Sequence, residues 1–72
     1  MPTKDEMILN GAYEEQILEA IRWNVKHDAQ QHSTMYGISK MIGLPETEVE
    51  RYARLMRSRE LILIINGFYY EV

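Results

Sequence analysis

The stretch Met35–Ile62, MYGISKMIGLPETEVERYARLMRSRELI, decides the fold of this 72-residue chain. It contains two runs whose apolar residues recur at helical spacing, and Gly43 separates them. Thr34 lies just before the first run, and threonine is favoured at the N-cap of a helix. We therefore predict one helix over residues 34–43, a tight turn, and a second helix over residues 45–59.

Apolar positions on both predicted helices would lock them together. These inward positions are Ile38, Ile42, Leu44, Val49, Tyr52, Ala53 and Met56. Small Ser39 is expected where the two helices pass close to each other, and Pro45 is tolerated in a first helical turn. This spacing of apolar, small and glycine residues resembles the helix-turn-helix of DNA-binding proteins.

Beyond Glu60 the apolar period changes from about 3.6 to 2, which predicts a β-hairpin over residues 61–72. Asn66-Gly67 at its centre is the strongest short signal for a type I′ turn. Both faces of this hairpin are largely apolar, so we expect both to be covered. The second face would be covered by the N-terminal segment, by the first helix or by another chain. Helices followed by a hairpin resemble the winged helix-turn-helix family, an α+β fold with a short wing.

The N-terminal part is predicted as an arm over residues 1–10 and a helix over residues 11–28. Thr3–Glu6 fits a capping box, but Asn10-Gly11 interrupts the following apolar residues. This interruption permits either an arm or a helical lead-in, and we favour the arm. The predicted buried stripe of the helix consists of Ile17, Ile21 and Val25, with Tyr13, Leu18 and Asn24 beside it.

Length and composition favour one domain, residues 1–72, in a soluble cytoplasmic protein. The chain has no cysteine, which excludes disulfides and thiolate metal sites. Its longest apolar run, Leu61–Ile65, is far shorter than the roughly 20 residues of a membrane span. The net charge is −3, and only residues 31–60 carry more basic than acidic side chains. DNA-binding surfaces are usually basic, so this charge argues partly against DNA.

The family resemblance implies that the second helix of the central stretch enters the major groove of DNA. Carried over to this chain, the residues that would face bases or adjacent phosphates are Thr47, Glu48, Arg51 and Arg54. Either arginine could bind guanine through two hydrogen bonds, and the glutamate could accept one from cytosine. Phosphate contacts would come from Tyr36, Lys40 and Arg57. The alternative interpretation is a solvated helix face that merely carries charge.

Two features depart from the family pattern. Glu60 stands where a glycine commonly ends the recognition helix, so a different helix exit is expected. The wing has no lysine or arginine, and its two-residue tip is too short for minor-groove contact.

Four usable cations per subunit imply weak binding by a monomer, so we expect a homodimer on double-stranded DNA. The residues proposed for a dimer or partner interface are Met7, Ile8, Leu9, Trp23, Ile64 and Tyr69. Packing within the monomer is the alternative role for the tryptophan. The rival function is a winged-helix module that binds a protein partner through its acidic first helix and apolar hairpin.

No pattern in the sequence supports catalysis, a cofactor or a metal site. His27 and His32 have no carboxylates at metal-ligand spacing and are interpreted as solvent-exposed. Glycines fall in turns, and no glycine-rich phosphate loop is present. Glu46, Glu48 and Glu50 are interpreted as capping and helix-dipole groups rather than as catalytic carboxylates.

Overall fold

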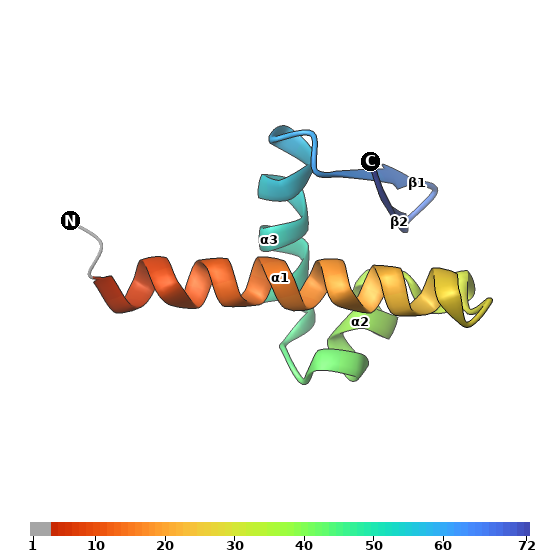
Figure 1. Ribbon diagram of the computed structural model, residues 1–72, viewed down its shortest axis with the longest axis horizontal. Coiled ribbons are helices and arrows are strands. Elements are labelled where there is room, and N and C mark those ends of the chain that lie inside the picture. Colours follow the sequence, from red (N-terminus) through yellow and green to blue (C-terminus); the bar gives the residue numbers. More distant parts are fainter. Residues whose placement is uncertain (1–3) are drawn as a thin grey trace.

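Three helices are followed by two antiparallel strands in the computed structural model, which describes residues 4–72 and side chains from Tyr13 onward. The elements are α1 (Lys4–Lys26), η1, a 3-10 turn (Gln30–His32), α2 (Met35–Ile42), α3 (Glu46–Ser58), β1 (Ile62–Ile65) and β2 (Phe68–Glu71). Figure 1 shows α3 crossing α1 steeply, with α2 behind α1 and the hairpin beside α3. This is the predicted α+β layout, and it is consistent with a winged-helix fold.

The first helix begins earlier than the sequence analysis predicts. It starts at Lys4 rather than at Gly11, so the expected arm is wrong for residues 4–10. A glycine inside a helix costs only about 1 kcal/mol relative to alanine, and neighbouring helix-forming residues can outweigh that cost. The capping-box pattern of Thr3–Glu6 was therefore the better guide to where this helix starts.

The core lies where α1, α2, α3 and the inner side of the hairpin meet. Its buried apolar residues are Ile17, Ala20, Ile21, Ile38, Leu44, Val49, Tyr52, Ala53, Met56, Ile62 and Tyr69. The predicted stripe on α1 is correct for Ile17 and Ile21 but wrong for Val25, which is 54% exposed. Eight residues at about 100° each turn the helix about 80° past its starting direction. Asn24, one residue earlier, is buried instead.

The ends of α2 match the sequence prediction. The side chain of Thr34 accepts a hydrogen bond from the Gly37 amide at 3.0 Å, which is an N-cap contact. Gly43 ends the helix in the left-handed conformation, at φ 71°. The Ser39 hydroxyl donates to the Leu44 carbonyl across the turn. The N-cap at Thr34 and the left-handed Gly43 therefore bound α2 as predicted, and the turn after Gly43 leads into α3, which packs on the core.

Glu60 ends α3 in the left-handed region, at φ 62°. Its amide donates to the Arg57 carbonyl at 3.0 Å, and the Leu61 amide donates to the Met56 carbonyl at 2.9 Å. These two bonds form a Schellman motif, in which glycine usually occupies the left-handed position. The expectation that glutamate here would produce a different helix exit is wrong. The glutamate takes the strained conformation itself.

Replacing this residue, in Glu60→Gly, is expected to stabilise the domain by up to about 1 kcal/mol, because glycine relieves the left-handed strain. The melting temperature should rise by a few degrees in a circular dichroism melt. Glu46→Gly is the matched control, because Glu46 lies in a right-handed first turn and is also exposed. A control variant as stable as Glu60→Gly would contradict this explanation.

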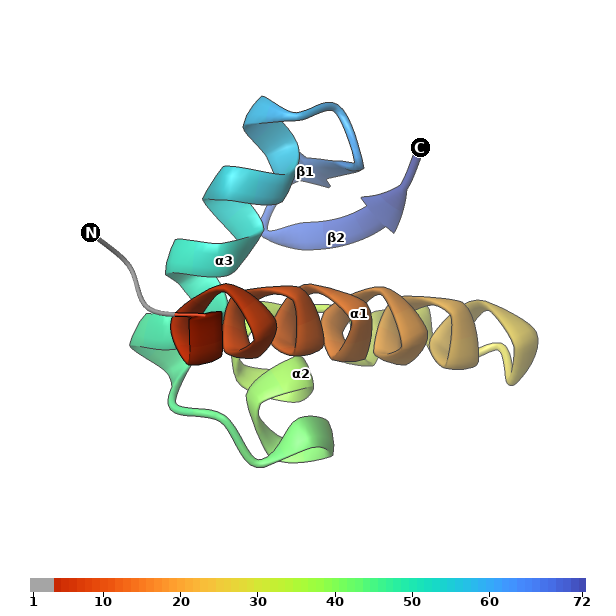
Figure 2. The ribbon, with the colours of Figure 1, turned by 60° about the vertical axis from the view of Figure 1, so that its left-hand side comes forward.

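The hairpin has the predicted register. Ile65 pairs with Phe68 and Leu63 with Tyr70, and both turn residues take positive φ as a type I′ turn requires. The edge of β2 that does not pair with β1 contacts the connector between α1 and α2. The Tyr69 amide donates to the Ser33 carbonyl at 2.7 Å. In Figure 2 the hairpin lies above α1, on the side away from α2.

An ion pair fastens the hairpin to α1. Both carboxylate oxygens of Glu71 accept hydrogen bonds from the Arg22 guanidinium, at 2.6 to 3.1 Å. These bonds hold the pKa of Glu71 below its ordinary value. Because the folded pKa is depressed, the stabilisation is present above the unfolded pKa and is lost as pH falls through the folded one.

We expect Glu71→Gln to lower the melting temperature by a few degrees at pH 7, and this difference from wild type to shrink as pH falls through the depressed pKa of folded Glu71. Below that pKa the wild-type carboxylate is itself protonated, so both proteins lack the charge. Glu15→Gln is the control, because its carboxylate lies 3.8 Å from Arg22. A pH-independent difference between wild type and Glu71→Gln would contradict the ion-pair assignment.

Candidate nucleic-acid interface

The recognition helix of the predicted motif, α3, is fixed on one side and exposed on the other. Its inward side chains are Val49, Tyr52, Ala53 and Met56, and all four are buried as predicted. Thr47, Arg51, Arg54 and Arg57 are exposed. The arginines at 51 and 54 have 63% and 69% of their side chains accessible. The structure therefore presents a rigid helix face with three arginines, one in each successive turn.

Carboxylates of the same helix pair with two of these arginines. Arg51 binds Glu48 and Arg54 binds Glu50, each at 2.7 Å. The hydrogen bond to Glu48 raises the pKa of the Arg51 guanidinium above its ordinary value. Within α3 three glutamates and three arginines give zero net charge. The α3 face is therefore electrostatically balanced rather than basic.

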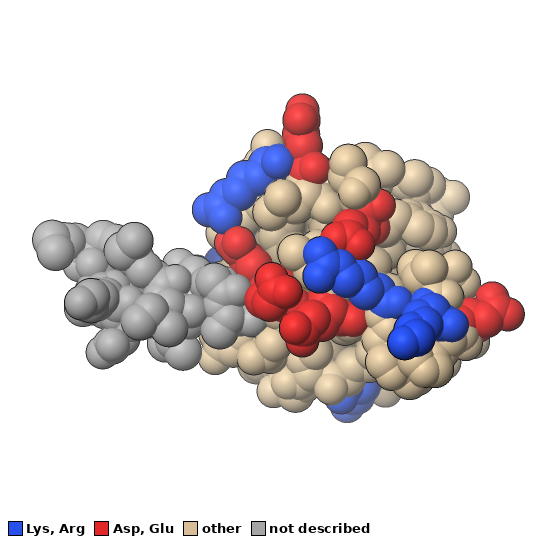
Figure 3. Space-filling view, viewed as in Figure 1, with Lys and Arg blue, Asp and Glu red and all other residues tan. Residues whose placement is uncertain are grey.

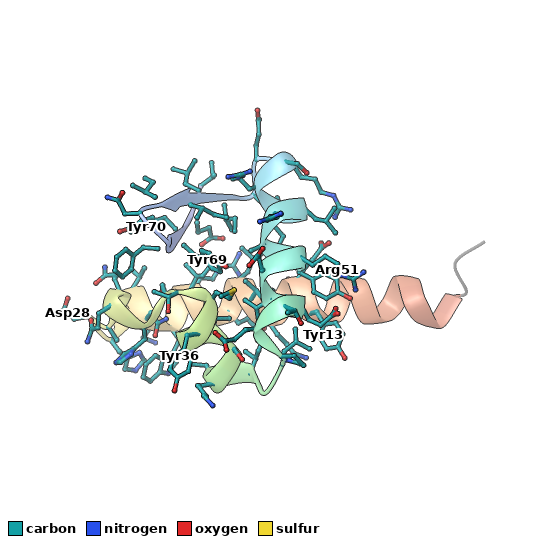
Figure 4. All side chains as sticks on the ribbon, turned by 180° about the vertical axis from the view of Figure 1, so that it is seen from behind. Tyr13, Asp28, Tyr36, Arg51, Tyr69 and Tyr70 are labelled. Carbon is teal, nitrogen blue, oxygen red and sulfur yellow. The ribbon has the colours of Figure 1, made fainter. Side chains whose placement is uncertain are left out.

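The predicted phosphate contacts on α2 are exposed and lie together. The Lys40 ammonium lies over the Tyr36 ring, 5.2 Å from its centroid, which is a cation–π contact. Figure 4 places Tyr36 and Arg51 on opposite sides of the α2–α3 pair. The Arg51 guanidinium lies over the Tyr52 ring at 5.1 Å, and this ring contacts Tyr13 of α1. The site residues thus form two groups, one on each helix.

Charges on the face of α1 are also mixed. Arg59 binds Glu14 at 2.8 Å, and Arg22 reaches both Glu71 and Glu15. Figure 3 shows acidic and basic side chains side by side over this face. The described part of α1 therefore carries charges of both signs in that view.

The two hairpin residues proposed for an interface, Ile64 and Tyr69, lie on the side of the hairpin that packs on the core. Tyr69 is 4% exposed and belongs to the core, and Ile64 packs against the core. This side of the hairpin faces inward because Ile62 and Tyr69 pack on the helices while Glu71 reaches Arg22. Burial raises the pKa of the Tyr69 hydroxyl, which keeps it neutral. Tyr69 is therefore not available for an interface, and Ile64 is only partly exposed.

The other proposed interface residues lie on α1. Trp23 is 50% exposed and stacks on His27, with ring centroids 3.9 Å apart. It is therefore only partly packed within the monomer. Met7, Ile8 and Leu9 are in the helix, but their side chains lie outside the described part of the structure.

Sequence reasoning missed the exposed side of the hairpin and one glycine. Leu63, Ile65 and Tyr70 are exposed, whereas alternation alone could not tell which apolar face would turn outward. Gly37 touches η1 so closely that an added Cβ would lie 2.1 Å from the His32 carbonyl oxygen. No local pattern marks this contact. Only the spacing of Asp/Glu and Arg residues could have indicated the ion pairs on α3.

A groove of about 720 Å³ separates α1 from α2. Trp23, Tyr36, Met41 and Ile42 contribute apolar walls, and Asn24 lies at its edge. The Asn24 amide donates to the Ser33 hydroxyl at 2.8 Å, while its oxygen has no hydrogen-bond partner within the described side chains. Because that oxygen is itself buried, it is not accessible to a molecule in the groove.

Neither a metal site nor a membrane span is found in the part of the chain that the structure describes. No group of three or more His, Cys, Asp or Glu residues there could hold a metal ion. No helix among residues 4–72 is both long and apolar enough to cross a bilayer.

Comparison with protein-family models, curated proteins and solved structures finds no match to this chain.

Proposed function

We propose that this protein binds double-stranded DNA through the exposed face of α3, as a small transcriptional regulator would. One observation carries this proposal. The side of α3 opposite the core presents Arg51, Arg54 and Arg57 in successive turns. Packing of α3 on the core, after α2 and the turn at Gly43, holds that side toward solvent. A helix anchored in this way is the element that winged-helix proteins place in the major groove.

Each exposed residue of the two helices has a role in this proposal. Arg51 and Arg54 are long enough to reach guanine or a phosphate, and Thr47 lies in the first turn of the same helix. Lys40 and Tyr36 offer phosphate contacts from α2, and Arg57 offers one from the far end of α3. Glu48 would accept a hydrogen bond from cytosine once Arg51 has turned away from it.

The ion pairs on α3 do not prevent this use of the helix. An exposed pair between side chains three or four residues apart contributes only about 0.3–0.5 kcal/mol and is screened by salt. A phosphate can therefore replace Glu48 or Glu50 as the partner of an arginine. The cost is that both glutamates then lie near the phosphates, which weakens binding. Low affinity with modest base discrimination is the expected outcome.

Fluorescence anisotropy with mixed-sequence duplex DNA, from low to physiological salt, tests the proposal. With four cations engaged, the logarithm of affinity should fall with the logarithm of salt at a slope of about −3 to −4. The double variant Arg51→Ala/Arg54→Ala should reduce that slope by about 2. Unchanged binding in the double variant, or no binding by wild type at low salt, would rule the proposal out.

A protein-binding module is the second candidate function. It is favoured by the zero net charge of α3 together with the exposed apolar side chains of the hairpin. Such a module would bind no DNA at any salt concentration, and substitutions at Arg51 and Arg54 would have no effect on its partner contact. The anisotropy experiment therefore separates the two functions.

A further inference from the structure

Leu55 is the only large apolar side chain that α3 leaves exposed, at 41%, and the structure describes every side chain of that helix. It belongs neither to the buried face of α3 nor to the charged contacts proposed for DNA. With its neighbours it lines a shallow groove of about 560 Å³ on the outward side of the helix. The lining residues are Glu50, Arg51, Arg54, Leu55 and Ser58. An apolar side chain thus lies among the arginines on which the proposed function depends.

Arg51 and Leu55 form one wall of this groove. They are four residues apart, so their side chains are neighbours on the same side of the helix, one turn apart. The Arg51 guanidinium binds Glu48 and lies over the ring of Tyr52. Figure 4 shows Arg51 on the same side of α3 as Tyr13 of α1. This wall therefore combines a cation, held toward α1, with an apolar side chain.

Glu50 and Arg54 form the opposite wall and bind each other at 2.7 Å. Besides burial, the charges of these two residues act on the pKa of the Tyr69 hydroxyl, so this ion pair lies on the side of α3 that faces the hairpin. Ser58 donates its hydroxyl hydrogen to the Leu55 carbonyl at 2.7 Å, so that hydrogen is already used within the helix. The ion pairs thus draw the two arginines to opposite sides, and the groove between them keeps Leu55 accessible.

Thymine carries the one apolar group on the major-groove edges of DNA, its C5-methyl group. A leucine side chain has no hydrogen-bond donor or acceptor, so this methyl group is the part of a base edge that it can bind favourably. The arginines on both walls suit the phosphates that flank such a base. We propose that Leu55 gives this protein a preference for thymine by packing on the C5-methyl group in the major groove. This inference rests on the proposed function, because it requires α3 to lie in that groove.

The place of Leu55 on α3 also locates the thymine relative to Arg51. Four residues of helix span about 6 Å, and bases stack about 3.4 Å apart along a strand. The thymine should therefore lie within about two base pairs of the group that Arg51 contacts. Complete burial of one methyl-sized group changes affinity about fourfold. The groove is open, so we expect a preference of about two- to fourfold for thymine.

Fluorescence anisotropy at low salt tests this with two duplexes of the same mixed sequence, one of which has uracil at every thymine position. Uracil pairs with adenine as thymine does and lacks only the C5-methyl group. Wild type should bind the thymine duplex about two- to fourfold more tightly. The salt slope should be the same for both duplexes, because the lost contact is uncharged.

Leu55→Ala should bind the two duplexes equally, because alanine does not reach the methyl group. Alanine suits an exposed helix position, so the variant is expected to fold. Met41→Ala is the matched control, since Met41 is 40% exposed and lies on α2, outside the groove on α3. It should keep the preference of wild type for the thymine duplex.

Two results would overturn this inference and leave the proposed function intact. Equal binding of both duplexes by wild type shows that no thymine methyl group is contacted, and this comparison needs no substitution. A preference that persists in Leu55→Ala, or is lost equally in Met41→Ala, shows that Leu55 is not its source. Absence of binding to either duplex by wild type overturns the proposed function as well, and it leaves the groove on α3 to a protein partner.

Discussion

Gly37→Ala is expected to destabilise the protein strongly, although alanine is the better helix former. A Cβ at this position would lie 2.1 Å from the carbonyl oxygen and 2.9 Å from the carbonyl carbon of His32. Both contacts are with backbone, so no side-chain rotation relieves them. Forcing such an overlap costs about 1–3 kcal/mol and occasionally more. A domain of this size has only about 4–11 kcal/mol of stability in total.

The consequences extend beyond the glycine itself. If η1 moves away from α2, Ser33 moves with it, because the two are joined along the chain. The buried bond from Asn24 to Ser33 and the bond from the Tyr69 amide to the Ser33 carbonyl would then lengthen. These bonds join α1, the connector and β2. A local overlap at α2 is therefore expected to weaken the attachment of the hairpin as well.

Thermal melts followed by circular dichroism measure this effect. At about 4–8 °C per kcal/mol for a small domain, Gly37→Ala should lower the melting temperature by about 10–20 °C. Met41→Ala is the control in the same helix, because its side chain is exposed and alanine suits a helix there. It should change the melting temperature little. A Gly37→Ala variant at least as stable as wild type would show that the close contact is not maintained.

Parts of the fold that local signals determine could be predicted from the sequence. Asn66-Gly67 specifies the turn by itself, because few other residue pairs accept two positive φ values, and that turn sets the register of both strands. Thr34 and Gly43 bound α2 for equally local reasons. Glu60 shows the limit of this reasoning, because the bonds around it were strong enough to hold a glutamate in a glycine conformation.

Parts that depend on distant contacts could not be predicted. Which face of the hairpin turns inward is decided by packing on the helices and by the Arg22–Glu71 pair, whose members lie 49 residues apart. Both faces of the hairpin were largely apolar, so two residues of the inner face were assigned to an interface. Of these, Tyr69 belongs to the core and Ile64 packs against it. The close approach at Gly37 likewise depends on how η1 returns to α2.

The helical period correctly predicted that the arginines of α3 would be exposed, but it did not determine their electrostatic state. Positions 51 and 54 face outward because they are out of phase with Val49 and Tyr52. Their pairing partners lie three or four residues earlier, where helical neighbours meet. Glu48 and Glu50 were interpreted as groups that complement the helix dipole, and Glu48 also as a hydrogen-bond acceptor for cytosine. Their pairing with arginine gives both carboxylates an effect on the candidate site that is opposite to that of the cations.

Removing those two carboxylates should therefore strengthen DNA binding. In Glu48→Gln/Glu50→Gln both arginines lose an intramolecular competitor for phosphate, and the face gains two units of positive charge. Each exposed pair three or four residues apart contributes only about 0.3–0.5 kcal/mol, which corresponds to about twofold in affinity for each pair. We expect the double variant to bind mixed-sequence duplex about three- to fivefold more tightly at low salt. The gain should diminish toward physiological salt, because screening weakens both interactions.

A matched control separates this local effect from a change in net charge alone. Glu15→Gln/Glu19→Gln removes the same two charges from α1, away from the arginines of α3. Its affinity should rise far less, because those carboxylates do not bind Arg51 or Arg54. An equal gain in both double variants would mean that DNA responds only to overall charge and that α3 has no special position. No gain in either would leave α3 as a solvated, charge-balanced face and would favour the protein-binding module.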